Sequence, residues 1–231
     1  MKIDFEKYGK YHRFYGTFDL PSEMHSINNL LKKRFRKINF LDIGSGDGNL
    51  VISLTKKYKW DFSISDVSKT RIKRSKEKLG DKVKNYLIDD ICNSKIKNNS
   101  FEFINSDQVI EHVPSDKKMV KEIKRILKKG GIFRVSSVYK KKFAWYFYRC
   151  NGKWVLDPTH LREYTSVDEY RKIFEYNGLK IIKIYTIKIN YPIIDFFLRL
   201  FKFETIDPLD FLRKIKVLVP GYRRIIIIGE K

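Results

Sequence analysis

Leu41-Asp42-Ile43-Gly44-Ser45-Gly46-Asp47-Gly48-Asn49 is the stretch that decides the fold. The run before its first glycine, residues 39–43, is mostly apolar, which predicts a short buried strand. From Leu50 onward apolar residues recur near helical spacing, which predicts a helix. Between the two, glycines on alternate positions leave room for a ligand to lie against the main chain. The pattern therefore predicts a ligand cradle, although a tight turn without a ligand would need the same glycines.

The spacing of these glycines indicates the kind of ligand. A dinucleotide-binding loop reads G-x-G-x-x-G and has an acidic ribose partner about 20 residues further on. Here the loop reads D-x-G-x-G-x-G, and Asp42 lies two residues before the first glycine. A carboxylate at that position would repel a pyrophosphate and suits a ligand with positive charge near the loop. The stretch resembles the first motif of the class I S-adenosylmethionine-dependent methyltransferases, whose ligand carries a sulfonium and an ammonium group.

The composition is that of a basic globular chain. With 231 residues, 42% of them hydrophobic and 33% charged, it can bury one substantial core. No apolar run is long enough for a transmembrane helix, and the first residues do not read as a signal peptide. Together with two isolated cysteines, Cys92 and Cys150, this predicts a cytoplasmic protein with reduced thiols. The net charge of +22 would attract RNA or an anionic membrane surface, and an AT-rich coding bias explains it equally well.

Strands and helices alternate along the chain. Strands are predicted over 61–65, 83–88, 101–105, 132–138, 179–189 and 222–228. Helices are predicted over 69–79, 115–128, 167–176 and, with Ser22 as its cap, 23–35. This alternation predicts the α/β class, with a doubly wound, mostly parallel sheet and helices on both faces. The resemblance implies the seven-stranded, Rossmann-like methyltransferase fold, here with a helical insertion before the last strand.

The resemblance covers residues 38–138 and depends on four features in order. They are the glycine loop, Asp66 after the second strand, Asp90 after the third, and F-E-F-I-N-S-x-x-x-I-E-H-V at 101–113. It implies S-adenosylmethionine as the cofactor and methyl transfer as the activity. By position it implies that the cofactor contacts Asp42, Gly44, Ser45, Gly46, Asp66, Val67, Asp90, Ile91 and Ser106. In that assignment Asp66 holds the ribose and Val67 flanks the adenine, although Asp66 could also cap the next helix.

The segment after the fourth strand narrows the acceptor. Methyltransferases that act on exocyclic amines of bases resemble one another in an N/D-P-P-Y/F tetrapeptide, whereas this chain has Asn105-Ser106-Asp107-Gln108. The segment looks most like the group that methylates small metabolites, lipids and sugars. The expected reaction is O-methylation of a small, lipid-linked or saccharide acceptor. An RNA-modifying methyltransferase that uses the basic surface is the alternative.

Histidines supply the candidate catalytic residues. The segment D-P-T-H-L-R-E-Y-T-S at 157–166 is similar to the H-x-R-x-[FY]-T segment of many small-molecule and glycan methyltransferases. His160 is therefore a candidate general base, and His112 in the E-H pair is a second one. Each histidine could instead anchor its loop by hydrogen bonds. The spacing of ligand-type residues predicts no metal site.

The expected organisation is a single domain over 1–231. An N-terminal cap with helices spans 1–37, the cofactor core 38–138, and a substrate-side region 139–190. In the last of these, lysines and aromatics at 139–148 suit an acidic, glycan or amphiphilic acceptor, and core packing would explain them equally well. Residues 191–220 read as a basic amphipathic helical insertion. It could be a lid, a homodimer interface or a peripheral membrane contact.

Overall fold

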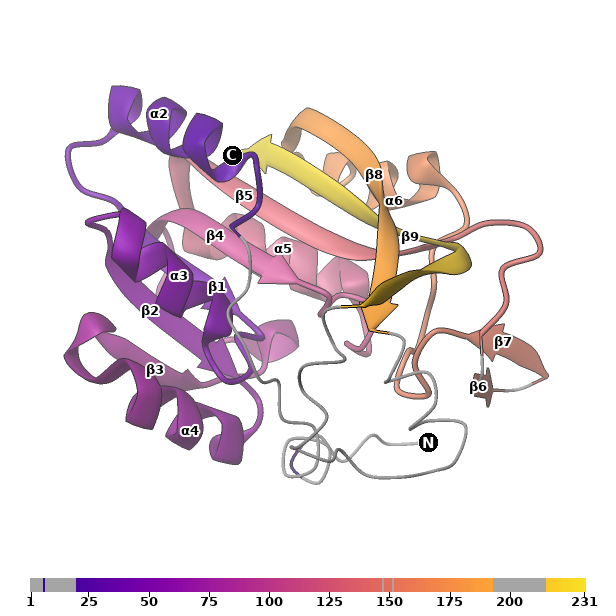
Figure 1. Ribbon diagram of the computed structural model, residues 1–231. Helices are drawn as coiled ribbons and strands as arrows, with labels where there is room; N and C mark the ends of the chain where they lie inside the picture. Colours follow the sequence, from indigo (N-terminus) through magenta and orange to yellow (C-terminus); the bar gives the residue numbers. More distant parts are fainter. Residues whose placement is uncertain (1–5, 7–19, 147, 151, 193–214) are drawn as a thin grey trace.

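The computed structural model describes residue 6 and residues 20–146, 148–150, 152–192 and 215–231. Its central feature is a seven-stranded sheet in the order β3-β2-β1-β4-β5-β9-β8 (Figure 1). The strands are β1 (Asn39–Ile43), β2 (Asp61–Asp66), β3 (Asn85–Ile88), β4 (Phe101–Asp107), β5 (Leu127–Lys140), β8 (Lys180–Pro192) and β9 (Lys216–Glu230). The pairs among β1 to β5 are parallel, and β9 is antiparallel to both of its neighbours. The chain order reverses between β1 and β4, so a ligand crevice is expected at their carboxyl ends.

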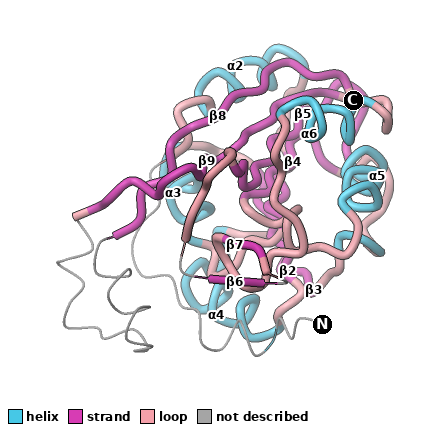
Figure 2. Tube along the Cα trace, turned by 90° about the vertical axis from the view of Figure 1, so that its right-hand side faces the viewer, coloured by secondary structure: helices cyan, strands magenta, loops and turns pink. Residues whose placement is uncertain are grey.

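Helices cover both faces of this sheet. They are α2 (Met24–Arg34), α3 (Asn49–Lys57), α4 (Lys69–Leu79), α5 (Asp116–Ile126) and α6 (Val167–Glu175). The first three pack in one apolar cluster with one face of the strands, and α5 and α6 pack in another. Figure 2 shows the same division, with α2, α3 and α4 on one side of the strands and α5 and α6 on the other. The predicted α/β, doubly wound fold is confirmed.

Amphipathic spacing explains why these helices dock. In α5 the buried residues are Met119, Val120, Ile123 and Ile126, which form one stripe at helical spacing. Ser115 caps this helix by accepting a hydrogen bond from the Lys118 amide at 3.3 Å. The helix ends at Ile126, two residues before the predicted end, because Leu127 is extended and buried as the first residue of β5. Gly130-Gly131 therefore lies within the strand.

The start of α2 also differs from the prediction. The helix begins at Met24 with Glu23 at the N-cap position, and no side chain caps it. Ser22 Oγ donates a hydrogen bond to Glu23 Oε2 at 3.3 Å instead of capping the helix. Glu23 Oε1 accepts one from Arg134 Nε at 2.6 Å. The ion pair with a buried arginine fixes this helix end, so the predicted Ser22 cap is wrong.

The ends of the predicted helical insertion belong to the sheet. β8 runs to Pro192 and β9 begins at Lys216, so residues 191–192 and 216–220 are strand. Antiparallel pairing of β8 with β9 satisfies the backbone groups there, with Tyr191 opposite Val217. Residues 193–214, and with them the rest of the amphipathic prediction, lie outside the described residues, as do residues 1–5 and 7–19 of the predicted N-terminal cap. A hairpin of β6 (Tyr148–Cys150) and β7 (Lys153–Val155) was not predicted.

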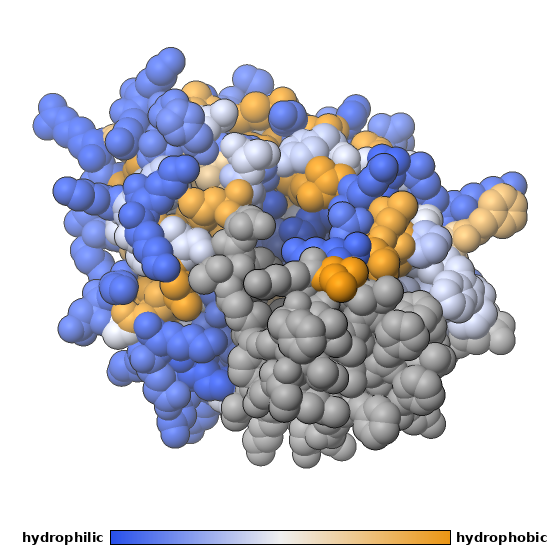
Figure 3. Space-filling model, viewed as in Figure 1, coloured by the Kyte–Doolittle hydropathy of each residue, from blue (hydrophilic) through white to orange (hydrophobic). Residues whose placement is uncertain are grey.

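The described part of the face in Figure 3 is mostly polar. Hydrophilic residues cover much of the face in Figure 3, and apolar residues lie on it as separate patches. Scattered apolar side chains of this kind are usual on protein surfaces. Within the described residues, no helix has the length and apolar character needed to cross a bilayer.

Candidate active site

The glycine loop after β1 adopts a backbone that requires glycine. Gly44, Gly46 and Gly48 have φ angles of 66°, 56° and 76°, a region that side chains disfavour. A Cβ on Gly44 would lie 2.3 Å from Val109 Cγ2, and one on Gly48 would lie 2.7 Å from Leu79 Cδ1. Tight packing is therefore sufficient to explain these two glycines. At Gly46 the nearest atom to such a Cβ is Arg71 Nη1, at 3.6 Å, so of the three loop glycines this one alone has room for a Cβ.

Asp66 closes the cradle from β2. Its Oδ2 accepts a hydrogen bond from the Gly46 amide at 3.0 Å, and its Oδ1 accepts one from the Ser68 amide at 2.9 Å. Each carboxylate oxygen keeps a second lone pair, which a ribose hydroxyl could use. Ser68, not Asp66, caps α4, because its Oγ accepts from the Arg71 amide. The next side chain, Val67, is 43% exposed, as a contact with a flat base requires.

The other predicted cofactor residues occupy varied environments. Asp42 is buried and accepts a hydrogen bond from Asn105 Nδ2 at 2.7 Å, and burial raises its pKa to about 7. The Ser45 amide donates to Ser65 O, and Ser106 Oγ donates to Ile43 O, which ties the ends of neighbouring strands together.

Asp90 and Ile91 follow the third strand of the sheet. Asp90 is exposed and its Oδ1 accepts from the Cys92 amide at 2.9 Å. The Ile91 side chain packs in the core, so its backbone is what remains available to a ligand. The structure brings residues 42–46 and 66–67 together at the carboxyl ends of β1 and β2, and their cofactor roles stay predictions.

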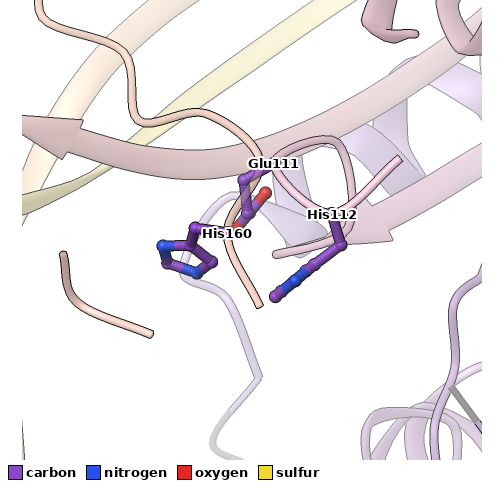
Figure 4. A group of neighbouring side chains, drawn as sticks. All are labelled: Glu111, His112 and His160. Atoms are coloured by element: carbon purple, nitrogen blue, oxygen red, sulfur yellow. The ribbon is translucent and has the colours of Figure 1, made fainter. Parts of the chain in front are cut away.

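A second group of side chains lies at the end of β4. Glu111 and His112 follow that strand, and His160 comes from the loop before α6 (Figure 4). The two imidazole centroids are 4.8 Å apart, with their planes at 63°. Candidate ligand atoms of all three residues lie within 4.8 Å of one another. We call Glu111, His112 and His160 the acceptor cluster.

Hydrogen bonds fix each member of the acceptor cluster. Ser137 Oγ donates to Glu111 Oε2 at 2.9 Å. His112 Nδ1 lies 3.3 Å from Thr159 O, and His160 Nδ1 lies 2.9 Å from Glu163 Oε1. Both histidines therefore anchor their loops through Nδ1, in agreement with the alternative to a catalytic role. The Nε2 atom of each ring is not used in these bonds.

Burial and neighbouring charges set the protonation of the cluster. Burial, with the charge of His160, lowers the pKa of His112 to about 4, so His112 is neutral at pH 7. Burial also disfavours charge on His160, but the bond to Glu163 and the charges of Glu111 and Asp157 outweigh it and raise its pKa. Burial raises the pKa of the Glu111 carboxyl to about 7. The cluster can thus hold or release a proton near neutral pH.

Arg162 joins the two loops that carry the cluster. Its Nη1 donates to Ile110 O and Val113 O, both at 2.7 Å, and its Nη2 donates to Pro114 O at 3.0 Å. The Leu161 amide adds a bond to Glu111 O at 2.9 Å. Sequence reasoning missed Arg162 and Glu163 as supports. Their position close to His160 in T-H-L-R-E-Y could have indicated these roles. A carboxylate often fixes the orientation of a functional imidazole, and an arginine can bind the carbonyl groups of a neighbouring loop.

Replacing Arg162 with alanine should lower the free energy of unfolding by about 2–3 kcal/mol, because it leaves three carbonyls without a donor. Denaturant unfolding followed by circular dichroism measures this. Lysine at 162 should recover only part of the loss, since one ammonium cannot span the same carbonyls. An Arg162→Ala variant as stable as the wild type would show that the loops are held by other contacts.

Comparison with known proteins identifies the domain that contains the glycine loop. Residues 41–135 match the family model described as the methyltransferase domain. Residues 41–135 therefore form a class I S-adenosylmethionine-dependent methyltransferase domain. This methyltransferase domain contains the glycine loop, Asp66, Glu111 and His112, whereas His160 lies beyond the matched residues. The predicted enzyme class and cofactor are confirmed, and the acceptor is not specified by the match.

The individual proteins that the chain resembles share less than a third of its residues over the aligned regions. Arsenite methyltransferase of Mus musculus is 27% identical over an alignment of 135 residues, which covers 52% of this chain and 36% of that protein. The chain thus spans about a third of the length of this curated relative. The YcgJ protein of Bacillus subtilis has a TM-score of 0.61 at 19% identity, covering 90% of this chain and 98% of that one.

Haemonchus contortus phosphoethanolamine N-methyltransferase 2, solved with phosphomonomethylethanolamine and S-adenosylhomocysteine, has a TM-score of 0.62 at 17% identity. That match covers 94% of this chain and 55% of the other. At such identities the structural matches show the fold.

Proposed function

We propose that the chain transfers the methyl group of S-adenosylmethionine to an oxygen of a small acceptor that binds at the acceptor cluster. One observation carries this proposal. Two histidines and a buried carboxylate meet after β4, at the same edge of the sheet as the cradle of Gly46 and Asp66. Parallel strands β1, β2 and β4 all end at that edge, so cofactor and acceptor groups can face each other.

The cradle fits the cofactor. S-adenosylmethionine supplies a methyl group on a positively charged sulfur, which is already reactive. Asp66 would accept the ribose hydroxyls, Val67 would lie against the adenine, and Gly46 would let the ligand approach the main chain. Ser106 lies at the end of β4, where the sulfur would face the acceptor. Orienting the two reactants is the main task left to the protein, and it can supply about 7–11 kcal/mol.

His160 is the better placed of the two histidines to accept a proton from the acceptor. Glu163 fixes its Nδ1, so in the neutral ring Nε2 carries the lone pair. The same carboxylate also faces Lys140 Nζ at 3.4 Å and Tyr222 Oη at 3.4 Å, and is thus held on several sides. General-base catalysis of this kind contributes about 10²–10⁴-fold.

A pocket beside this site favours an anionic acceptor. Its volume is about 900 Å³, and its lining includes Tyr139, Lys140, Lys141, Lys142, Phe143 and Trp154. Phe143 is 89% exposed with a φ of 66°, and Lys142 Nζ lies 5.3 Å from its ring centroid. Lysines beside aromatic faces suit an acceptor that carries a phosphate or carboxylate next to an apolar part. Lys140 links the pocket to Glu163, and so to His160.

Exchanging both Lys141 and Lys142 for glutamate should raise KM about 10-fold or more and leave kcat nearly unchanged, because the lysines act on binding. Steady-state methyl transfer into the acceptor fraction that takes up label measures this. Lys56→Glu with Lys57→Glu is the matched control, since it changes the net charge equally on the last turn of α3. Equal KM values in the two double variants would remove the pocket from acceptor binding.

Labelled methyl transfer tests the proposed function. The chain is incubated with methyl-labelled S-adenosylmethionine and cell extract, and the products are separated into small-molecule, lipid, glycan, RNA and protein fractions. We expect label in an anionic small-molecule, lipid-linked or saccharide fraction, and loss of that label with His160→Asn. Label confined to RNA would support the alternative, which rests on the net charge of +22 alone. No transfer to any fraction would contradict the proposal.

A further inference from the structure

Three polar atoms of the acceptor cluster remain after its hydrogen bonds are assigned. Glu111 is fully buried, and no described residue donates a hydrogen bond to its Oε1, which is itself buried. His160 uses Nδ1 for Glu163 and His112 uses Nδ1 for Thr159, which leaves Nε2 of each ring. A buried carboxylate oxygen without a donor is costly, so the site as it stands calls for a positively charged or hydrogen-bonding partner.

The supports around the histidines match those of metal ligands. A metal-binding histidine usually donates its second ring N–H to a carboxylate or a backbone carbonyl, which orients the ring and fixes the tautomer. His160 has the Glu163 carboxylate in this role at 2.9 Å, and His112 has the Thr159 carbonyl at 3.3 Å. With Nδ1 protonated, Nε2 of each ring is a lone-pair donor.

Local charge also favours a cation. The chain as a whole is strongly basic, yet Glu111, Asp157 and Glu163 all lie near the two histidines, where their charges act on His160. Asp157 is held in place because its Oδ1 accepts from the Thr159 amide at 2.8 Å. Three carboxylates therefore lie close to the two imidazoles. Hydrogen bonding to neutral histidines would not require this negative charge, whereas binding of a cation would be favoured by it.

We propose that Glu111, His112 and His160 bind one divalent transition-metal cation through Oε1 and the two Nε2 atoms. Two imidazoles and one carboxylate suit Zn²⁺, Fe²⁺ or Co²⁺. One ligand-type atom from each of the three residues lies within 4.8 Å of the others, and side-chain rotations would bring the ligand atoms to metal–ligand distances of about 2.0–2.2 Å. The site departs from the sequence expectation of no metal, because 47 residues separate the two histidines and no local spacing signals them.

Three protein ligands leave coordination positions open, as in catalytic metal sites. An acceptor oxygen bound there would lose its proton more easily, and His160 would then serve as a ligand and not as the base. This use of the cation rests on the proposed function, whereas binding of the cation does not. The two can therefore be tested separately.

Titration of the untagged, EDTA-treated full chain with Co²⁺ tests the proposal. We expect one equivalent to bind, with visible d–d absorption, and Zn²⁺ to displace it. His112→Asn, His160→Asn and Glu111→Gln should each weaken binding by about 100-fold or more. His25→Asn is the matched control and should change nothing, because His25 is exposed on α2.

The titration of the wild type alone shows whether a divalent cation binds, even if a variant fails to fold. Less than about 0.1 equivalent of Co²⁺ or Zn²⁺ bound at micromolar protein, or binding that survives in a folded His112→Asn/His160→Asn double variant, would overturn the proposal. Zn²⁺ should also raise the melting temperature of the wild type and not that of the double variant. Metal binding without methyl transfer would contradict the proposed function and leave this site intact. Methyl transfer unchanged by EDTA, with no metal bound, would support the proposed function and contradict the metal site.

Discussion

Arginine in place of Gly46 should abolish binding of S-adenosylmethionine, weakening it by roughly 100-fold or more, about 3 kcal/mol. Gly46 is the glycine of the loop that packing does not explain, since an added Cβ would meet only Arg71 Nη1 at 3.6 Å. A long side chain there would fill the space between the main chain and Asp66, whose Oδ2 lies 3.0 Å from the Gly46 amide. Isothermal titration calorimetry measures the affinity directly.

Gly80→Arg is the matched control for this experiment. Gly80 has a φ of 50°, close to that of Gly46, and an added Cβ would meet nothing within 4 Å. Both substitutions therefore introduce the same charge at a residue with a positive φ, so a folded Gly80→Arg variant shows what such a change does to binding away from the cradle. If Gly46→Arg binds the cofactor as tightly as Gly80→Arg does, the ligand does not lie in the cradle.

Replacing Arg134 with methionine should lower the free energy of unfolding by about 3–5 kcal/mol. Arg134 is 2% exposed, and it donates to Glu23 Oε1 at 2.6 Å, to Asp107 Oδ1 at 2.9 Å and to Asn105 Oδ1 at 3.1 Å. Its loss removes a charged donor from the partly buried carboxylates of Glu23 and Asp107. Asn105 in turn holds Asp42, so the change should also loosen the base of the glycine loop.

Thermal and denaturant unfolding measure this effect. Arg171→Met is the control, because Arg171 forms an exposed pair with Asp168 at 3.7 Å that should contribute under about 1 kcal/mol. An Arg134→Met variant within about 1 kcal/mol of the wild type would show that the network around Arg134 adds little to stability.

Acid should narrow the gap between wild type and Arg134→Met. Burial disfavours the Asp107 carboxylate, but Arg224 and Arg134 outweigh it and hold its pKa well below 3.8. A lowered folded-state pKa contributes stability above the unfolded value, and that stability is lost as the pH falls below about 3.8. Without Arg134 the pKa of Asp107 is lowered less, so the variant loses less stability in acid. The difference in unfolding free energy between wild type and Arg134→Met should therefore shrink below pH 4.

Local patterns were sufficient for most of the core. Apolar runs that end at polar residues predicted the strands up to β4, and the loop from Gly44 to Gly48 was placed correctly between β1 and α3. Predictions failed where distant contacts override local signals. Leu127 leaves the helix because β5 pairs it with Phe101, and β8 and β9 lengthen because they pair with each other.

The candidate site was predicted in part for the same reason. His112 and His160 were chosen one at a time, because no local spacing shows that their rings lie 4.8 Å apart. The two rings lie close together because Arg162 binds backbone carbonyls some 50 residues earlier in the chain. Arg134 was read as an ordinary strand residue, and its burial becomes understandable only with Glu23 and Asp107 beside it.

A crystal structure of the chain with S-adenosylhomocysteine tests the central claim most directly. The ribose should bind Asp66, the adenine should lie against Val67, and the sulfur should point from the Gly46 side toward the acceptor cluster. A ligand bound elsewhere, or a cradle closed by side chains in the presence of saturating ligand, would contradict the account.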